Sequence, residues 1–116
     1  MTDSILSKKS AAFALDIIRY YQWLTAVKNE LFMSKQLLRS GTSIGEIISE
    51  AYVMPNNAEF VAKLQYAVKE VAETDYWLYL LRESGYMAPE FESIKPDMDE
   101  VNRVLILTLK TAKNKK

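Results

Sequence analysis

Neither cysteine nor histidine occurs in this 116-residue chain. The absence of cysteine excludes disulfides, thiolate nucleophiles and cysteine zinc sites. The absence of histidine removes the commonest general base and the commonest transition-metal ligand. No apolar run approaches the roughly 18 residues that a membrane span needs, and the first residues lack the apolar core and cleavage site of a signal peptide. The sequence therefore predicts a cytoplasmic protein without a membrane span.

The chain also has no net charge, because its 15 basic side chains balance its 15 acidic side chains. This balance argues against strong, indiscriminate binding of nucleic acid. Glycine and proline are scarce, at three residues each, so few positions interrupt regular structure. Hydrophobic residues make up 49% of the chain, enough for a core. We expect a single domain spanning residues 1–116.

The longest regular pattern lies between residues 57 and 84. Its core positions recur at alternating steps of four and three, which keeps them on one face of a helix supercoiled left-handedly against its neighbours. These positions are Phe60, Leu64, Ala67, Val71, Thr74, Leu78 and Leu81. Similar patterns predict helices over about 7–31, 34–52 and 90–112. Short loops make neighbouring helices antiparallel, so the predicted fold is all-α: a left-handed, up-down-up-down four-helix bundle.

The other three helices each have a predicted core face. The first contains Phe13, Ile17, Tyr20, Leu24, Val27 and Leu31; the second Leu37, Gly41, Ile44, Ile48 and Ala51; and the last Ile94, Met98, Val101, Leu105, Thr108 and Ala112. Gly41 either allows a neighbouring helix to approach closely or marks a break in the second helix. We expect Ser34 to cap that helix.

The remaining helix ends carry recognisable signals. Asn56 or Asn57 is expected to cap the third helix, and Glu59 would complete a capping-box arrangement with Asn56. Gly85 is expected to end this helix in a left-handed conformation. Pro96 falls inside the last helical pattern and predicts either a kink or a restart there.

Two carboxylate pairs could belong to a metal site of the kind that helical bundles host: Glu46 with Glu50, and Glu70 with Glu73. Such sites combine glutamates with Glu-x-x-His pairs, and this chain has no histidine. We therefore interpret the pairs as solvated or interhelical salt-bridge residues and expect no metal and no cofactor.

Nucleophilic and phosphate-binding motifs are missing too. The hydroxyls between Ser40 and Ser43 have no histidine or lysine base beside them. The three glycines form no phosphate-binding loop. The sequence predicts a protein that is not an enzyme and has no small-molecule substrate.

Charge is unevenly distributed along the chain. Residues 1–45 carry six basic and three acidic side chains, and the last seven residues carry four lysines and no acid. From Glu83 to Glu100 the sequence contains six acidic side chains and one basic side chain, Lys95. If the basic segments converge, they form a phosphate-binding patch; the alternative is a soluble surface of mixed sign. The candidate nucleic-acid contacts are Lys8, Lys9, Lys35, Arg39, Lys110 and Lys113.

Apolar side chains that fall off the core faces are numerous. They either broaden the core or form lateral surfaces through which bundles associate, and we expect association. The residues are Tyr21, Trp23, Val61, Val68, Tyr76, Tyr79 and Leu107, of which Tyr21, Trp23, Tyr76 and Tyr79 are the candidate contacts with a second copy or a partner.

Two segments resemble a known family. The first reads Ser34-Lys-Gln-Leu-Leu-Arg39-Ser40-Gly-Thr-Ser43-Ile44-Gly45, followed by Glu50-Ala51, and is similar to the second-helix motif of the 23S rRNA intervening-sequence proteins. The second resembles their third helix through Phe60, Lys63-Leu64, Ala67, Lys69-Glu70, Glu73-Thr74 and Trp77-Leu78.

The resemblance implies a small bacterial four-helix bundle linked to RNA or a nucleoprotein. Related accessory variability determinant proteins of diversity-generating retroelements are pentamers, bind nucleic acid and engage a reverse transcriptase. The resemblance therefore implies a homo-oligomer, with a pentamer as one candidate, and adds Gln36 to the candidate interface. The predicted function is an RNA- or nucleoprotein-associated adaptor; the alternative is a protein-interaction scaffold that does not bind nucleic acid.

Overall fold

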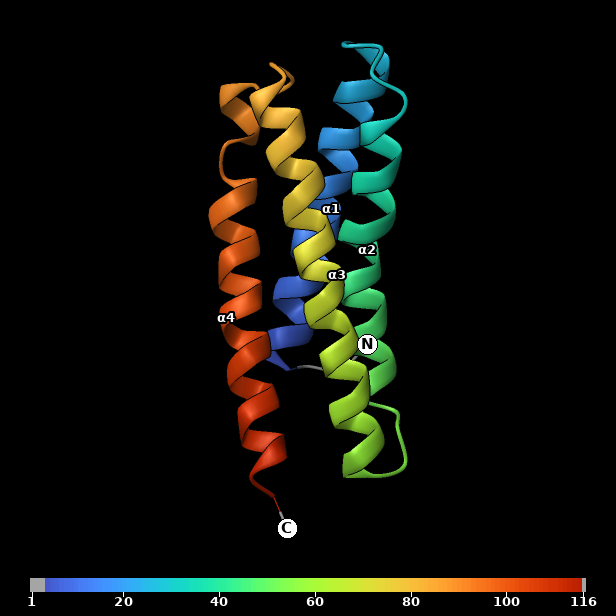
Figure 1. The fold of residues 1–116 in the computed structure, drawn as a ribbon, viewed down its shortest axis with the longest axis vertical. Coiled ribbons are helices and arrows are strands. Elements are labelled where there is room, and N and C mark those ends of the chain that lie inside the picture. Colours follow the sequence, from blue (N-terminus) through green and yellow to red (C-terminus); the bar gives the residue numbers. More distant parts are fainter. Residues whose placement is uncertain (1–3, 116) are drawn as a thin grey trace.

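Four long helices form an elongated bundle in the computed structural model, which describes residues 4–115. The elements are α1 (Ile5–Ala26), α2 (Met33–Ala51), α3 (Asn57–Glu83), the short 3-10 helix η1 (Pro89–Phe91) and α4 (Ile94–Lys113). Successive helices run alternately up and down along a molecule measuring 50 × 21 × 20 Å (Figure 1). The predicted all-α four-helix fold is confirmed. The left-handed supercoil stays a prediction.

The core consists largely of the residues at the predicted steps of four and three. Every predicted core position of α2 is buried, and in α3 all are buried except Phe60, which is half-buried. In α4 Thr108 is half-buried and the neighbouring Leu109 is buried in its place. The periodicity therefore identified the packed faces because each helix has to remove one apolar stripe from water.

The end of α1 differs from the sequence prediction. The helix ends at Ala26 rather than near Leu31, and Val27 and Leu31 are 67% and 63% exposed instead of buried. The cause is Asn29, which adopts a left-handed conformation with φ of 55°. Asparagine tolerates this conformation better than most residues and commonly ends helices. The Glu30 amide then donates to the Leu24 carbonyl (2.9 Å), so the chain turns back before the apolar pattern stops.

The start of α2 is capped by Glu30 and not, as predicted, by Ser34. The Glu30 carboxylate accepts hydrogen bonds from the amides of Ser34 (2.7 Å) and Phe32 (3.3 Å). An anionic acceptor at this position also interacts favourably with the positive end of the helix dipole. Ser34 is buried, and its hydroxyl donates to the Glu30 carbonyl (2.7 Å).

Gly41 lies inside an uninterrupted α2, so the predicted alternative of a helix break is wrong. A Cβ atom at this position would lie 3.0 Å from Cγ1 and Cγ2 of Ile17 on α1. Ordinary carbon–carbon contacts are longer, at about 3.5–4.0 Å. Glycine therefore allows α1 and α2 to pack closely, as the other interpretation predicted.

The caps of α3 agree with the sequence prediction. Asn56 accepts a hydrogen bond from the Glu59 amide (2.9 Å), and the Asn56 amide group donates to the Glu59 carboxylate (2.9 Å). Gly85 follows the last turn with φ of +91°. This is a left-handed conformation that residues with a Cβ rarely adopt.

The start of α4 lies later than predicted, at Ile94 rather than residue 90. Pro89 begins the separate turn η1, and the chain restarts as a helix after Ser93. Pro96 therefore lies in the first turn of α4, where its missing amide has no intrahelical acceptor to lose. Of the two predicted outcomes at Pro96, the restart is the one found.

Candidate functional site

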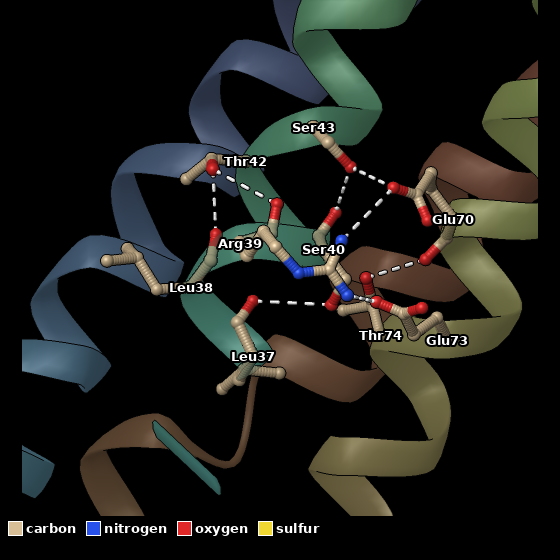
Figure 2. Close-up of polar contacts among 9 residues, drawn as sticks. All are labelled: Leu37, Leu38, Arg39, Ser40, Thr42, Ser43, Glu70, Glu73 and Thr74. Atoms are coloured by element: carbon tan, nitrogen blue, oxygen red, sulfur yellow. Dashed lines mark hydrogen bonds and ion pairs between the residues drawn. The ribbon is translucent and has the colours of Figure 1, made fainter. Parts of the chain in front are cut away.

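An ion-pair cluster joins α2 to α3 near the middle of the bundle (Figure 2). The Arg39 guanidinium pairs with the Glu73 carboxylate and lies 3.8 Å from the Glu70 carboxylate. Ser43, one turn after Arg39 on α2, donates a hydrogen bond to Glu70 (2.8 Å). Glu70 is only 7% exposed. The cluster thus holds a nearly buried carboxylate between a cation and a hydroxyl.

Helix geometry explains how the cluster forms. Arg39 and Ser43 are four residues apart on α2, and Glu70 and Glu73 are three residues apart on α3, so each pair lies on one face of its helix. A buried carboxylate without a partner is strongly unfavourable, and removal of its partner is costly. The cluster therefore fixes how α2 and α3 align. Of the two interpretations of Glu70 and Glu73, solvated residues or an interhelical salt bridge, the salt bridge is the one found.

The hydroxyl groups around this cluster are engaged by the backbone. Thr42 donates to the Leu38 carbonyl (2.7 Å), and Thr74 donates to the Glu70 carbonyl (2.7 Å). Within residues 4–115 no three histidine, cysteine, aspartate or glutamate side chains gather closely enough to hold a metal ion. In this cluster the carboxylates, the guanidinium and the Ser43 hydroxyl bind one another, so its direct effect is to align α2 with α3.

The six candidate nucleic-acid contacts do not form one patch. Lys35 and Arg39 belong to the first two turns of α2, which begins at the upper end in Figure 1. Lys8 and Lys9 belong to the first turns of α1, in the lower half, and Lys110 and Lys113 to the end of α4, at the lower end. The up-down topology thus separates basic segments that the sequence prediction allowed to converge.

Two of these six cations are already paired within the chain. Arg39 belongs to the α2–α3 cluster, and Lys9 lies 3.3 Å from the Glu100 carboxylate. Hydrogen bonds to Glu100 from Arg103 and, secondarily, from Lys9 lower the pKa of that carboxyl to about 2.

The other four, Lys8, Lys35, Lys110 and Lys113, are exposed, and none pairs with an acid within residues 4–115. Lys8, Lys110 and Lys113 remain as unpaired cations in the lower half of the bundle.

The predicted interface residues divide into exposed and packed side chains. Tyr76 and Tyr79 are 56% and 60% exposed, whereas Tyr21 and Gln36 are half-buried. Trp23 packs within the chain, with its ring centroid 5.3 Å from that of Phe91 in η1 and 6.1 Å from that of Tyr20.

A second exposed apolar surface was not among the predicted sites. Leu15 is 53% exposed and Ile18 36% exposed on α1. Leu15 borders a groove of about 480 Å³ between α1 and α2, whose lining includes the small residues Ala11, Ala14 and Gly45. The sequence signal for this surface is weak, because it consists only of apolar residues lying off the core face.

Chain reversal and core packing at the η1 end depend on Tyr20. Its ring is fully buried, and its hydroxyl donates to the Tyr86 carbonyl (2.6 Å). Burial raises the pKa of the Tyr20 hydroxyl well above its ordinary value, an effect that Arg82 partly opposes. Tyr20 is therefore a neutral structural hydrogen-bond donor.

These features define a small helical-bundle protein whose polar cluster aligns helices and whose surface exposes lysines, tyrosines and an apolar groove. The sequence matches the family model of the 23S rRNA-intervening sequence protein over residues 2–107, so the chain belongs to that family. The family resemblance predicted from the second and third helices is thus confirmed.

One solved structure is similar over nearly its whole length. It is a protein of unknown function from the S23 ribosomal protein family of Bacteroides thetaiotaomicron, with 45% sequence identity and a TM-score of 0.87. The match covers 91% of this chain and 99% of that chain. Comparison with curated proteins gives no match. Among residues 4–115, no helix combines the length and apolar character required to cross a membrane.

Proposed function

We propose that this protein is a non-enzymatic, oligomeric adaptor that associates with RNA or a nucleoprotein in the bacterial cytoplasm. The observation that carries the proposal is the charge of the segment ending at the lower end of the bundle. Residues 110–116 contain four lysines and no acid, and Lys110 and Lys113 are exposed in the last turn of α4. Membership of a family named for 23S rRNA intervening sequences supports ribosomal RNA as the partner.

Electrostatics explains how a neutral protein could bind RNA at such an end. Each lysine that contacts a phosphate releases condensed counterions, so affinity depends on the local cations and on salt rather than on net charge alone. Lys8 at the start of α1 adds a further unpaired cation in the same half. The remaining predicted contacts, Lys9, Lys35 and Arg39, are either paired with acids or situated away from this end.

The test is fluorescence anisotropy of a structured 23S rRNA fragment at about 50 and 200 mM salt, a range over which phosphate contacts weaken strongly. We expect binding by the wild type to weaken with salt. The double substitution Lys110→Gln/Lys113→Gln should lower the slope of log affinity against log salt by roughly 1.4 to 1.8, because each lost contact contributes about 0.7 to 0.9.

Lys28→Gln/Lys35→Gln provides the charge-matched control, since both lysines lie around the α1–α2 connection at the opposite end of the bundle. We expect this variant to retain the wild-type salt slope. Equal losses in both double variants would show that binding follows total charge and not the lower end. Absence of wild-type binding at the lower salt would overturn direct RNA recognition.

Self-association forms the second part of the proposal. Leu15 places exposed apolar area beside the α1–α2 groove, Ile18 follows it three residues later on α1, and the small groove residues would let a helix of a second copy approach closely. Exposed apolar surfaces of this kind commonly mark contacts between proteins. A pentamer, the size that the family resemblance suggests, is the assembly against which measured masses should be compared.

A protein-interaction scaffold without nucleic-acid contact is the second candidate function. The exposed rings of Tyr76 and Tyr79 favour it, because tyrosine is enriched at the energetic centres of protein interfaces. Loss of a protein partner on substitution of these tyrosines, with no wild-type binding to RNA, would support this candidate over the first.

A further inference from the structure

A shallow aromatic groove lies between α3 and α4 near the end where η1 connects them. It has a volume of about 370 Å³, and its lining includes the rings of Tyr76 and Tyr79, the carboxylate of Asp75 and the cationic side chains of Arg82 and Lys95. Both tyrosines are more than half exposed. Since they contribute little to the core, the groove offers two aromatic rings to a molecule outside the bundle.

One of these rings is held in place. The Tyr76 ring lies 5.2 Å from the Trp77 ring at an interplanar angle of 71°, and Trp77 in turn packs edge-on against Phe32 at 6.2 Å. A ring that is already restrained loses less conformational freedom when a partner binds. The groove therefore has one preorganised aromatic wall.

The cations that line the groove are neutralised within the chain. Lys95 lies 2.8 Å from Asp99 and 3.2 Å from Asp75, and Arg82 lies 3.4 Å from Glu92. The hydrogen bond to Asp99, with a further one to Asp75, raises the pKa of Lys95 and so keeps it charged and paired. Neither cation is free to bind an anionic ligand without first leaving its carboxylate.

The ends of α3 and α4 that form the groove, and the connection between them, are rich in acidic side chains. Residues 75–100, from the second half of α3 to the first half of α4, contain seven acidic and two basic side chains in a chain whose net charge is zero. Glu83 and Glu90 are exposed and have no ion-pair partner among residues 4–115, whereas Asp97 lines a separate hollow between α1 and α4. This excess of negative charge repels a polyanion such as RNA and attracts a cationic segment.

We propose that this groove docks a lysine- or arginine-rich segment of a protein partner. The tyrosine faces carry the negative part of the ring quadrupole and attract an ammonium or guanidinium group placed over them. The surrounding carboxylates complement the same charge. This inference does not rest on RNA binding, because the groove lies at the opposite end of the molecule from Lys110 and Lys113 (Figure 1).

The experiment is an NMR titration of isotopically labelled protein with a short peptide of alternating arginine and glycine. The matched control peptide carries glutamate in place of arginine. We expect the arginine peptide to shift the backbone amides of residues 72–82 and 95, and the glutamate peptide to shift none of them. Absence of shifts, or shifts centred on another surface, would overturn the proposal even if no variant were made.

Variants then separate the aromatic contribution from general charge attraction. The double substitution Tyr76→Ala/Tyr79→Ala should lower the affinity for the arginine peptide about tenfold, the effect expected for the loss of two cation–π contacts of roughly 0.5 to 1 kcal/mol each. Tyr66→Ala is the control, since Tyr66 is 51% exposed on α3 but lies outside the groove lining.

Three other results would overturn the proposal. Unchanged peptide affinity in the double variant would leave charge alone as the attraction. Loss of self-association in the double variant, without loss of peptide binding, would make a second copy the occupant. Weakened RNA binding with intact peptide binding would assign the groove to nucleic acid.

Discussion

Tyr20 shows how a single polar atom is accommodated in the centre of an apolar bundle. It is the largest fully buried side chain among residues 4–115, and its hydroxyl reaches the Tyr86 carbonyl beyond the end of α3. A buried hydroxyl without an acceptor would cost about 1–3 kcal/mol. The hydrogen bond thus ties α1 to the connection between α3 and α4 while the ring fills the core.

The raised pKa of Tyr20 predicts a loss of stability in alkaline solution. In the unfolded chain a tyrosine ionises near pH 10, whereas the folded protein keeps the Tyr20 proton to higher pH. The contribution of this group is therefore complete below about pH 10. Above that value it should fall by roughly 1.4 kcal/mol per pH unit until the folded-state hydroxyl ionises.

Urea unfolding at a series of pH values between 8 and about 12, spanning the ionisation of tyrosine, measures this effect. Tyr20→Phe should lower the unfolding free energy at pH 8 by about 1–2 kcal/mol through the lost hydrogen bond and should flatten the alkaline decline. Tyr66→Phe, at an exposed position, should keep the wild-type decline. If the Tyr20→Phe variant lost stability at high pH as steeply as the wild type, a group other than Tyr20 would be the cause of that loss.

Single residues also show where sequence interpretation reaches its limit. The role of Gly41 was predictable, because a glycine on a core face has few explanations besides close approach or a break. The cap of α2 was not, because Glu30 acts across a turn that exists only once Asn29 has adopted its left-handed conformation. Ser34 was the better candidate on local preference alone, and the tertiary turn overrode it.

At the scale of elements, α2 and α3 are joined by an ion pair to a nearly buried carboxylate. Arg39 is 55% exposed in its side chain, so its ion pairs are partly screened by solvent, whereas Glu70 is nearly buried. Removing Arg39 leaves the Glu70 carboxylate with the Ser43 hydroxyl as its remaining side-chain partner. The pair should therefore stabilise the bundle more than a surface ion pair does.

A double-mutant cycle with Arg39→Gln and Glu70→Gln tests this expectation. We expect Arg39→Gln to lower the unfolding free energy by about 1–2 kcal/mol, between the values typical of exposed and buried pairs, with a coupling energy near 1 kcal/mol. The exposed pair of Arg19 and Asp16 on α1, 2.8 Å apart, is the control and should couple by a few tenths of a kcal/mol.

Additive effects of the two substitutions would contradict a structural role for this pair. Measurement of RNA affinity on the same Arg39→Gln protein adds a second criterion. If Arg39→Gln weakened RNA binding and left the unfolding free energy unchanged, the result would support the sequence prediction that Arg39 contacts nucleic acid.

The helices themselves were predictable, and some of their boundaries were not. Steps of four and three identified the buried faces of α2 and α3 because these patterns run to the ends of the elements. In α1 the pattern continued through Val27 and Leu31 although the helix had already ended. The periodicity of apolar residues predicts which residues would share one face of a helix. It does not predict where the helix ends, which in α1 is determined by the chain reversal at Asn29.

At the scale of the whole molecule, the bundle separates three surfaces that the linear sequence mixes. The lower end carries unpaired lysines, the η1 end carries the tyrosine groove, and the α1–α2 face carries exposed apolar side chains. Sequence interpretation identified the lysines and two of the tyrosines. Their separation was not predictable, because it depends on which helix ends meet.

If the protein self-associates through the α1–α2 face, one charged substitution in that face should lower the mass of the protein in solution. The wild type should have a mass in solution that is a multiple of 13.3 kDa. Leu15→Glu should shift this mass toward the monomer, because burying an unpaired carboxylate in an apolar interface is unfavourable. The measurement is light scattering coupled to size-exclusion chromatography.

Val53→Glu is a matched control for this prediction, since Val53 is 74% exposed in the α2–α3 connection, away from the groove. It should retain the wild-type mass. A monomeric wild type, or an oligomer that survives Leu15→Glu, would direct the search for an interface to another face.

Acidic side chains around η1 and lysines at the end of α4 lie at opposite ends of a molecule 50 Å long, so this neutral protein has charge of opposite sign along the length of α4. Near a polyanion the field would turn the molecule so that α4 approaches with its carboxyl end first, before any contact forms. Fewer encounters would then be wasted in wrong orientations, and association would be fast at low salt and slower as ions screen the field. Because the net charge is zero, the long-range attraction between the protein and a polyanion is weak. The separation of charge along the molecule determines which end of the bundle contacts the polyanion first.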